Sequence, residues 1–177
     1  MVKITTVAKA LPPYTRSTAE ILPYIEAWLS GQEDRFRRKV LKIFRNAGVD
    51  HRYSIIDAPE MFLPRSFEEN NNRYMEGAIA LSEESLRAAL AKAQWKPEDL
   101  DYIITVSCTG FMIPSVDAHL INRLGMRQDI VRLPVTEMGC AAGISGLIYA
   151  HNQHGQCSQR CDLWRRLRLC IIVLSSR

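Results

Sequence analysis

Cys140 stands among small residues in the run Gly139-Cys140-Ala141-Ala142-Gly143. We expect this run to follow a strand and to open an apolar helix, where the helix dipole and the free N–H groups favour a thiolate. A thiolate is the form of cysteine that attacks acyl groups, and small neighbours leave room for the resulting thioester. The backbone N–H of Cys140 can also help to hold a developing oxyanion. The residues alone equally permit a buried, inert packing cysteine.

The remaining cysteines must also be judged as thiols. The chain has five cysteines, an odd number, and we expect no secretory signal peptide, so a disulfide framework is disfavoured. Near the carboxyl end, suitable zinc ligands occur, but their spacing matches no familiar zinc motif. We therefore expect no metal site among His151, His154, Cys157 and Cys161.

Basic residues are the second source of candidate chemistry. The 177 residues carry a formal net charge of only +4, scattered over short stretches, which gives nucleic-acid binding little support. A helix predicted over residues 33–47 has apolar and basic side chains on different faces. The basic face is either solvated surface or a patch for the phosphates of a carrier such as coenzyme A. The apolar face comprises Phe36, Val40, Ile43, Phe44 and Ala47, and the basic face Arg35, Arg38, Lys39, Lys42 and Arg45.

Several amino-terminal elements follow from the pattern of residue types. Alternation of β-branched residues predicts a first strand over residues 2–7. Ser17 and Glu20 form a capping-box pattern that opens a helix, which Pro23 weakens or shifts. The helix over 33–47 ends where Gly48 stands, and a short strand is expected over residues 52–56.

A long helix is predicted in the middle of the chain. Residues 59–64 are expected to form a loop, after which Ser66 and Glu69 repeat the capping-box pattern. The helix should then continue to about Ala93. Its expected core residues are Met75, Ile79, Leu86 and Leu90.

The elements around Cys140 alternate between strand and helix. Residues 102–108 form an almost continuous apolar, β-branched run, as expected of a central strand covered on both faces. A helix over residues 115–124 should end at Gly125, and another strand is expected over residues 130–134. This alternation predicts an α/β layered fold.

Two sequence blocks are similar to those of a known family. Residues 133–143, with Glu137-Met138-Gly139-Cys140, resemble the nucleophile segment of type III polyketide synthases, the chalcone and stilbene synthase family, whose pattern is Gly-Cys-x-Ala-Gly. Residues 101–117 resemble the family's strand, its threonine-rich turn and a short proline-containing loop. The resemblance covers about residues 2–152. We therefore expect a family domain over residues 1–152 and a divergent tail over residues 153–177.

The resemblance implies a fold and an activity. The fold would be the amino-terminal half of a thiolase-like α/β fold, with a mixed sheet and packed helices. Cys140 would take a starter acyl group from acyl-CoA, and malonyl-CoA would extend it by decarboxylative condensation. No metal or tightly held organic cofactor is implied. The full-length form is expected to be a homodimer in the cytoplasm, with no nucleic-acid or membrane partner.

The resemblance also implies roles for residues other than Cys140. Lys39 and Lys42 correspond to positions near the CoA phosphates, although Lys42 replaces a more usual arginine. Cys108 and Thr109 correspond to the turn that lines the starter pocket.

The loop that reaches the neighbouring subunit in the family corresponds to Ile113 and Pro114.

The chain departs from the family after about Gln153. Family catalysis needs a histidine and an asparagine from the second half, beyond residue 177. None of the four histidines present, His51, His119, His151 and His154, corresponds to the family's catalytic histidine. We therefore expect a shifted reading frame after residue 152 and no condensation by this chain alone. We also expect apolar surface on the helix over residues 139–149 to promote aggregation.

Two other hypotheses remain open from the sequence. A ketoacyl-ACP synthase III relative would also carry a cysteine in a turn of small residues, although its segment more often reads Ala-Cys-Ala. A non-catalytic protein could instead pair with a full-length synthase through the loop over residues 111–116. No apolar stretch reaches the roughly 18 residues of a membrane span, so a soluble, cytoplasmic protein is expected.

Overall fold

The computed structural model describes residues 3–160 and 168–174, with side chains up to Gln153 in the first range. The chain divides into two compact units. The smaller unit comprises residues 11–70. The larger unit comprises the segment before residue 11 together with the chain from Asn71 onward, and it contains Cys140.

A parallel three-stranded sheet forms the centre of the larger unit. Its strands are β3 (Tyr102–Ser107), β4 (Val131–Thr136) and β5 (Leu169–Leu174), in the order β4-β3-β5. Tyr102 pairs with Val131 on one side and with Leu169 on the other. Every residue of β3 is buried, which confirms the central strand predicted from the continuous apolar run.

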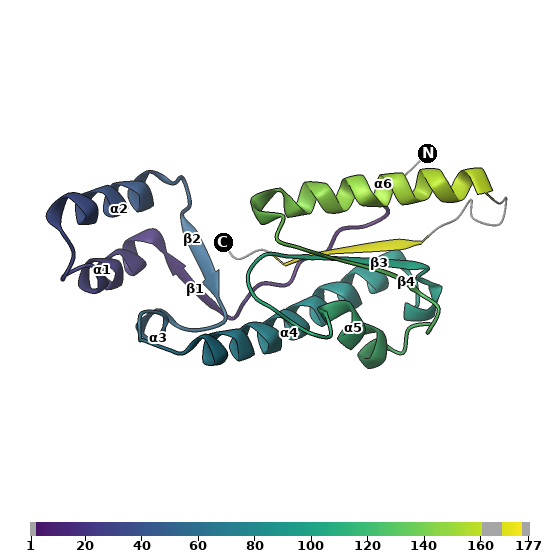
Figure 1. The fold of residues 1–177 in the computed structure, drawn as a ribbon, viewed down its shortest axis with the longest axis horizontal. Coiled ribbons are helices and arrows are strands. Elements are labelled where there is room, and N and C mark those ends of the chain that lie inside the picture. The colour runs from purple at the N-terminus through teal and green to yellow at the C-terminus, as the bar shows by residue number, and fades with distance from the viewer. Residues whose placement is uncertain (1–2, 161–167, 175–177) are drawn as a thin grey trace. The chain divides into compact units, whose positions relative to one another are not determined.

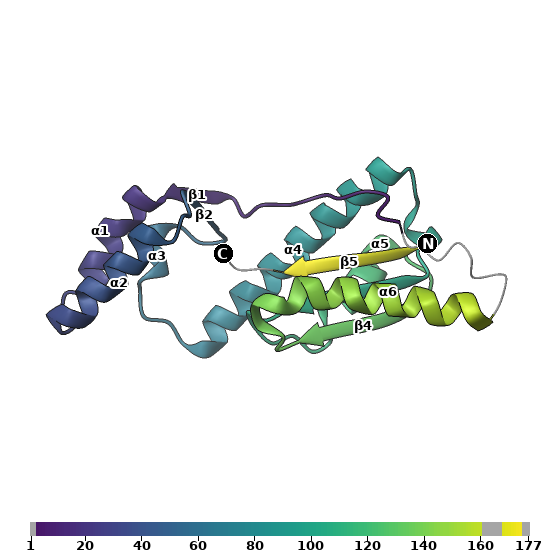
Figure 2. The same ribbon diagram turned by 90° about the horizontal axis from the view of Figure 1, so that it is seen from above.

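Helices cover both faces of this sheet (Figure 1). One face of β3 packs against α6 (Ala142–Arg160), and Figure 2 shows α6 running along the sheet. The opposite face packs against α4 (Phe67–Ala93), of which Asn71 onward belongs to this unit, and α5 (Val116–Leu124). The core on the α6 side includes Tyr102, Ile104, Val106, Val135, Ala142 and Ala150. The core on the other side includes Leu86, Leu90, Leu100, Ile103, Leu120, Ile121 and Ile172.

Two glycines allow α6 to approach the sheet closely. A Cβ placed on Gly146 would stand 3.1 Å from methyl carbons of both Val106 and Ile171. A Cβ on Gly143 would stand 3.7 Å from Val173. The spacing of three residues places both glycines on the buried side of the helix. The small residues after Cys140 therefore also serve packing.

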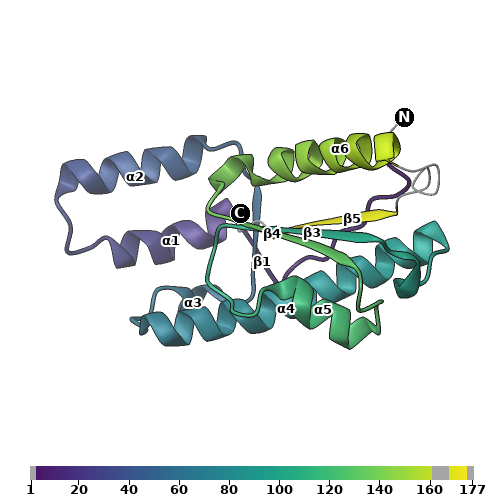
Figure 3. The same ribbon diagram turned by 45° about the vertical axis from the view of Figure 1, so that its right-hand side comes forward.

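The smaller unit contains a two-stranded sheet and the helices α1 to α3, and Figure 3 shows these elements. The antiparallel strands are β1 (Tyr14–Ser17) and β2 (His51–Ser54). The longer helices, α1 (Thr18–Trp28) and α2 (Asp34–Asn46), lie side by side, and a short helix, α3 (Ala58–Met61), follows β2. Their core consists of Ile21, Ile25, Leu29 and Leu41.

Most element boundaries agree with the expected ones. Both capping boxes form: the Ser17 hydroxyl accepts from the Glu20 amide at 3.2 Å, and the Ser66 hydroxyl accepts from the Glu69 amide at 3.1 Å. α5 ends at Gly125, whose φ of 62° is in the left-handed region that glycine favours. A short 3-10 turn, η1 (Pro97–Asp99), precedes β3.

Three expectations about the amino-terminal half are wrong. Residues 3–7 form no strand, because no partner strand lies beside them in the described part of the chain, and Val7 is 73% exposed. Residues 58–61 are helical, since Asp57 caps the helix by accepting from the Ala58 amide. The helix α1 runs from Thr18 through Pro23, so the expected shift of its start is wrong, whereas weakening of the helix by this proline stays a prediction.

The buried side of α2 also differs from the expected one. Leu41 is its buried residue, with Val40 and Phe44 partly buried beside it. Phe36 and Ile43 are instead 50% and 59% exposed. A periodic pattern alone could not choose between neighbouring faces, because the contact with α1 decides which side is covered.

Part of the expected tail takes regular structure. The helix α6 continues to Arg160, and β5 pairs with β3 beyond it. The side chains of His154, Cys157 and Cys161, named as possible zinc ligands, lie outside the described residues. Among the residues searched, no group of histidine, cysteine or acidic side chains could hold a metal. In the described segments, no helix is both long and apolar enough to cross a membrane.

Candidate active site

Cys140 lies in the turn that joins β4 to α6. Two residues of this turn take left-handed backbone conformations: Glu137 with a φ of 64° and Gly139 with a φ of 55°. Open space surrounds the position of a Cβ on Gly139, so conformation rather than crowding favours glycine there. Cys140 itself belongs to the short 3-10 turn η2 (Gly139–Ala141), and α6 begins directly after it.

The Cys140 side chain is exposed, which excludes the buried packing role that the residues alone left open. The residue lies directly before the first turn of α6, where a helix has free N–H groups and the positive end of its dipole. Behind it, Ala142 is 5% exposed and packs against the sheet. An exposed thiol on a rigidly packed helix start suits attack on an incoming acyl group.

The loop after β3 lies at the same edge of the sheet as the turn of Cys140. Strands β3 and β4 run parallel, and their last paired residues are Ser107 and Thr136. Cys108 directly follows this pair on β3, so both exposed thiols belong to loops at the carboxyl ends of adjacent strands. In α/β folds this edge is where ligands bind.

Two residues of the β3 loop were expected to reach a neighbouring subunit. Ile113 is 98% exposed, and its bond to Pro114 is cis. Phe111 in the same loop is 61% exposed. The loop therefore presents two large apolar side chains to its surroundings.

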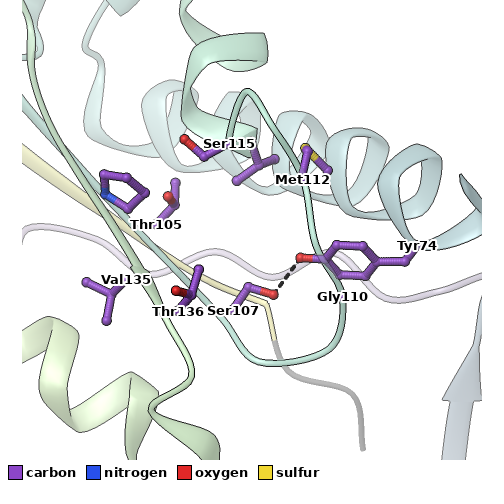
Figure 4. A pocket seen from close by; sticks show the side chains of 10 residues that line it. Tyr74, Thr105, Ser107, Gly110, Met112, Ser115, Val135 and Thr136 are labelled. Carbon is purple, nitrogen blue, oxygen red and sulfur yellow. Dashed lines mark hydrogen bonds between the residues drawn. The ribbon is translucent and has the colours of Figure 1, made fainter. Parts of the chain in front are cut away.

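A small pocket lies beneath this loop (Figure 4). Its volume is about 30 Å³, enough for about two water molecules and too small for an acyl chain. None of the three residues Cys140, Cys108 and Thr109 lines it. Its walls are Tyr74, Thr105, Ser107, Gly110, Met112, Ser115, Val116, Pro134, Val135 and Thr136.

A buried carboxylate supports the loop from below. Asp117, at the start of α5, is completely buried and accepts from the Thr105 hydroxyl at 3.3 Å. Arg132 of β4 donates to Asp117 at 2.5 Å and to the Ser115 hydroxyl at 3.2 Å. These bonds join β3, β4 and α5 just below the edge that carries both thiols.

The basic residues expected at the CoA phosphates belong to the smaller unit. Lys39 and Lys42 are exposed on α2, as are Arg35 and Arg38. By contrast, Arg45 is paired with Glu26 of α1 at 3.2 Å. Among the predicted site residues, the larger unit therefore holds Cys140, Cys108, Thr109, Ile113 and Pro114, and the smaller unit holds Lys39 and Lys42.

Sequence reasoning missed four residues that shape this edge. Asn71 and Tyr74 come from α4, Ser107 ends β3, and Asp117 opens α5. Little in the sequence indicates that Asp117 is buried, because an acidic residue in the first turn of a helix is usually exposed and interacts with the helix dipole. The contacts of Asn71 and Tyr74 span 40 and 33 residues and have no local signature.

Comparison with known proteins identifies the family. The family model described as FAE1/Type III polyketide synthase-like protein matches residues 15–154. The chain belongs to the type III polyketide synthase family. This match favours the polyketide synthase form over the ketoacyl-ACP synthase III form. The family is one of acyltransferases, and its match includes Cys140 and the loop after β3.

Curated relatives include several bacterial synthases and a fungal one. The chain is 38% identical over 116 residues to a 1,3,6,8-tetrahydroxynaphthalene synthase of Streptomyces griseus, covering 66% of this chain and 31% of that protein. It is 32% identical over 149 residues to the Streptomyces peucetius synthase of the same name, covering 84% and 39%. A phloroglucinol synthase of Pseudomonas fluorescens is 32% identical over 111 residues, covering 63% and 32%.

Solved type III polyketide synthases share the fold. The Streptomyces coelicolor 1,3,6,8-tetrahydroxynaphthalene synthase superposes with a TM-score of 0.82 at 26% identity, covering 94% of this chain and 45% of that one. A Neurospora crassa pentaketide synthase gives a TM-score of 0.85 at 24% identity, with 98% and 46% covered. The α/β fold, about half of a thiolase-like structure, is thereby confirmed. The chain spans between 31% and 39% of the curated relatives described above.

Proposed function

We propose that Cys140 is the acyl-accepting nucleophile of a type III polyketide synthase. The observation that carries this proposal is the exposed thiol at the start of α6, at the carboxyl edge of a parallel sheet. The family match over residues 15–154 supports it, because that match spans the nucleophile segment. Glycine and alanine on either side leave space for a thioester.

The loading step is a thioester exchange. The Cys140 thiolate attacks the carbonyl carbon of an acyl-CoA and forms a tetrahedral oxyanion. Backbone N–H groups at the start of α6 stabilise the negative oxygen. The bond between the carbonyl carbon and the CoA sulfur then breaks, CoA leaves as a thiolate that takes a proton from water, and the acyl group stays on Cys140.

Chain extension follows in a complete synthase. Malonyl-CoA loses carbon dioxide, its enolate carbon attacks the thioester carbonyl, and the Cys140 sulfur leaves. The histidine and asparagine that the family uses for this step correspond to positions beyond residue 177, so we assign only the loading step to the residues of this chain. Condensation is proposed for the enzyme that also contains those groups.

Lys39 and Lys42 are proposed to bind the phosphates of the CoA carrier. Both ammonium groups are exposed on α2, as are the guanidinium groups of Arg35 and Arg38 on the same helix. Phosphate oxygens are well matched to such a patch. A solved relative, the fungal CsyB, was crystallised with CoA-SH, and its likeness to this chain shows the shared fold.

Acyl loading can be tested directly on this chain. We expect incubation with hexanoyl-CoA to add one hexanoyl mass, released by hydroxylamine as a thioester would be, and measured by intact-protein mass spectrometry. Cys140→Ala should abolish the adduct, while Cys108→Ala, which removes the other exposed thiol near this edge, should keep it. Equal loading of the Cys140→Ala variant would refute the assignment.

The phosphate patch needs its own test. The double variant Lys39→Ala/Lys42→Ala should raise the hexanoyl-CoA concentration needed for half-maximal loading by about threefold to tenfold, as loss of two exposed charge contacts predicts. The control is Lys3→Ala/Lys9→Ala, which removes the same charge from exposed lysines outside α2. An equal effect of both double variants would point to net charge rather than to a site.

A second proposed role concerns the exposed loop. Ile113 and Pro114 are proposed to contact a second synthase chain, because Ile113 is 98% exposed beside the 61% exposed Phe111. Coexpression with a full-length synthase should give a complex that Ile113→Asp weakens. Val7→Asp, at another exposed apolar residue, is the control. A complex that both variants leave intact would contradict this role.

A further inference from the structure

Asn71 of α4 makes two hydrogen bonds to the backbone of the loop after β3. Its side-chain amide donates to the Phe111 carbonyl oxygen at 2.9 Å, and its side-chain oxygen accepts from the Phe111 N–H at 2.9 Å. The amide thus pairs with Phe111 as a neighbouring strand would. Two bonds to one residue, one on each of the peptide groups that flank Phe111, fix both the position and the orientation of the backbone there.

Tyr74 holds the same loop one helical turn further along. Its hydroxyl is 2.5 Å from the Ser107 hydroxyl, and Figure 4 shows this bond closing one side of the pocket. Its ring lies flush against Gly110, because a Cβ there would stand 2.4 Å from the ring carbon Cδ1. Residues three apart on a helix share one face, so Asn71 and Tyr74 act from the same side of α4.

These contacts enclose the residues that the proposed function uses. Only Cys108, Thr109 and Gly110 lie between Ser107 and Phe111, so this short segment is held at both ends. Two residues beyond Phe111 stands Ile113. A segment tethered at both ends retains few conformations.

We propose that Asn71 and Tyr74 are positioning residues that set the place of Cys108 and Thr109 beside Cys140 and the direction in which Ile113 projects. The proposal rests on the proposed function, since it assigns a purpose to the loop whose Cys108 and Thr109 were expected to line the starter pocket. Neither residue touches the acyl group. They act through the backbone of the loop, and α4 is the rigid element that carries them.

Three consecutive asparagines offer matched controls. Asn71 is half-buried and makes the clamp, whereas Asn70 and Asn72 are exposed on either side of it. Asn71→Ala should speed hydrogen exchange at the Phe111 amide at least tenfold, and Asn72→Ala should change it less than twofold. Amide exchange resolved by NMR measures both. Unchanged exchange in Asn71→Ala would overturn the clamp.

A conservative variant separates positioning from general destabilisation. Protonated aspartic acid has a donor and an acceptor, as asparagine has, but ionised aspartate only accepts. In Asn71→Asp at pH 7, the carboxylate still accepts from the Phe111 amide but can no longer donate to the Phe111 carbonyl oxygen. Exchange of the Phe111 amide should therefore stay at least threefold slower than in Asn71→Ala. Exchange as fast as in Asn71→Ala would overturn the proposal.

The tyrosine and the thiols supply an independent readout. Tyr74→Phe keeps the ring against Gly110 but removes the bond to Ser107. We expect it, like Asn71→Ala, to change the alkylation rate of Cys108 by iodoacetamide at least threefold while that of Cys140 stays constant. Equal changes at both thiols would mean general loosening and would overturn the proposal.

Failure of the clamp and failure of the proposed function give different results. If wild-type Cys140 takes no acyl group from hexanoyl-CoA but the Phe111 amide responds to Asn71→Ala, the proposed function fails and the clamp stands. If Cys140 is loaded but Phe111 exchange is the same in Asn71→Ala and Asn72→Ala, the clamp fails and the proposed function stands.

Discussion

Arg132 on β4 donates from Nε to the Oδ2 atom of Asp117 at 2.5 Å, and Asp117 is completely buried at the start of α5. The carboxylate also accepts from the Thr105 hydroxyl. One buried charge thus ties two strands and a helix together directly below the edge that carries Cys108 and Cys140. Buried charges are tolerated where such partners surround them.

Removing the Arg132 side chain should leave the buried Asp117 carboxylate without its ion-pair partner. We expect Arg132→Met to lower the free energy of unfolding by about 2–3 kcal/mol, less than the about 3–5 kcal/mol of a fully buried pair, because the Arg132 side chain is 41% exposed. Urea unfolding measures the change. Arg123→Met is the matched control: its partner Glu83 lies 3.2 Å away in a more exposed pair, worth about 0–1 kcal/mol. Equal losses would contradict the burial argument.

Cys170 should make stability fall in alkaline solution. Burial raises the pKa of this thiol from 9.0 to about 12. The folded state therefore holds the proton more tightly than the unfolded chain, so the contribution is complete below pH 9 and is lost as pH rises from 9 to 12. Cys170→Val should flatten the decline in that window by up to about 1.4 kcal/mol per pH unit. Urea unfolding at pH 8.5 and pH 10.5 tests this.

A substitution that removes no titratable group supplies the control for the alkaline experiment. Val173→Ala, on the same strand β5, should keep the alkaline decline of the wild-type chain. If the free energy of unfolding of Cys170→Val falls as steeply from pH 8.5 to pH 10.5 as that of the wild-type chain, burial of Cys170 does not cause the loss of stability in alkaline solution.

The close contact between α6 and the sheet gives a steric prediction. Gly146→Val should cost about 1–3 kcal/mol of unfolding free energy, because its side chain must displace Val106 and Ile171, whose methyl carbons already stand 3.1 Å from the position of a Cβ. Gly31→Val adds the same group where nothing lies within 4 Å. Thermal unfolding should separate the two variants by several degrees, and indistinguishable melting temperatures would argue against tight packing at Gly146.

Exposed apolar residues on α6 predict self-association. Ile144, Leu147 and Ile148 are 67%, 51% and 53% exposed, which places three large apolar side chains on one stretch of helix. Substituting all three by serine should lower the fraction of large species seen by light scattering after size-exclusion chromatography. Val7→Ser, at a single exposed residue on a different segment, should have little effect. A monodisperse wild-type monomer would contradict this expectation.

Local patterns predicted the elements that depend on neighbours in sequence. The continuous run of β3, the capping boxes at Ser17 and Ser66, and the helix end at Gly125 all follow from residues within one or two turns. The prediction of a strand at residues 3–7 failed because a strand also needs a partner strand, which an alternating pattern cannot supply. The prediction of the buried face of α2 failed for a similar reason, because the contact with α1 decides which face is covered.

The site was predictable only in part. Gly139 and Cys140 formed a recognisable turn, and the exposure of the thiol then decided between nucleophile and packing residue. Asn71 could not be singled out among three asparagines, because its partner Phe111 is 40 residues away. The boundary at residue 152 stays a prediction, and the strand β5 beyond it shows that regular structure continues past that point.

The order of strands, with β3 between β4 and β5, has a consequence for synthesis of the chain on the ribosome. β4 can pair with β3 soon after it emerges, but the opposite edge of β3 stays open until β5 follows. The 39 residues from Val131 to Leu169 take about 2–8 s to translate at about 5–20 residues per second. During that interval Ile103 and Ile104 lie at an unpaired, apolar edge, so a ribosome-associated chaperone has several seconds in which to bind the nascent sheet before β5 closes it.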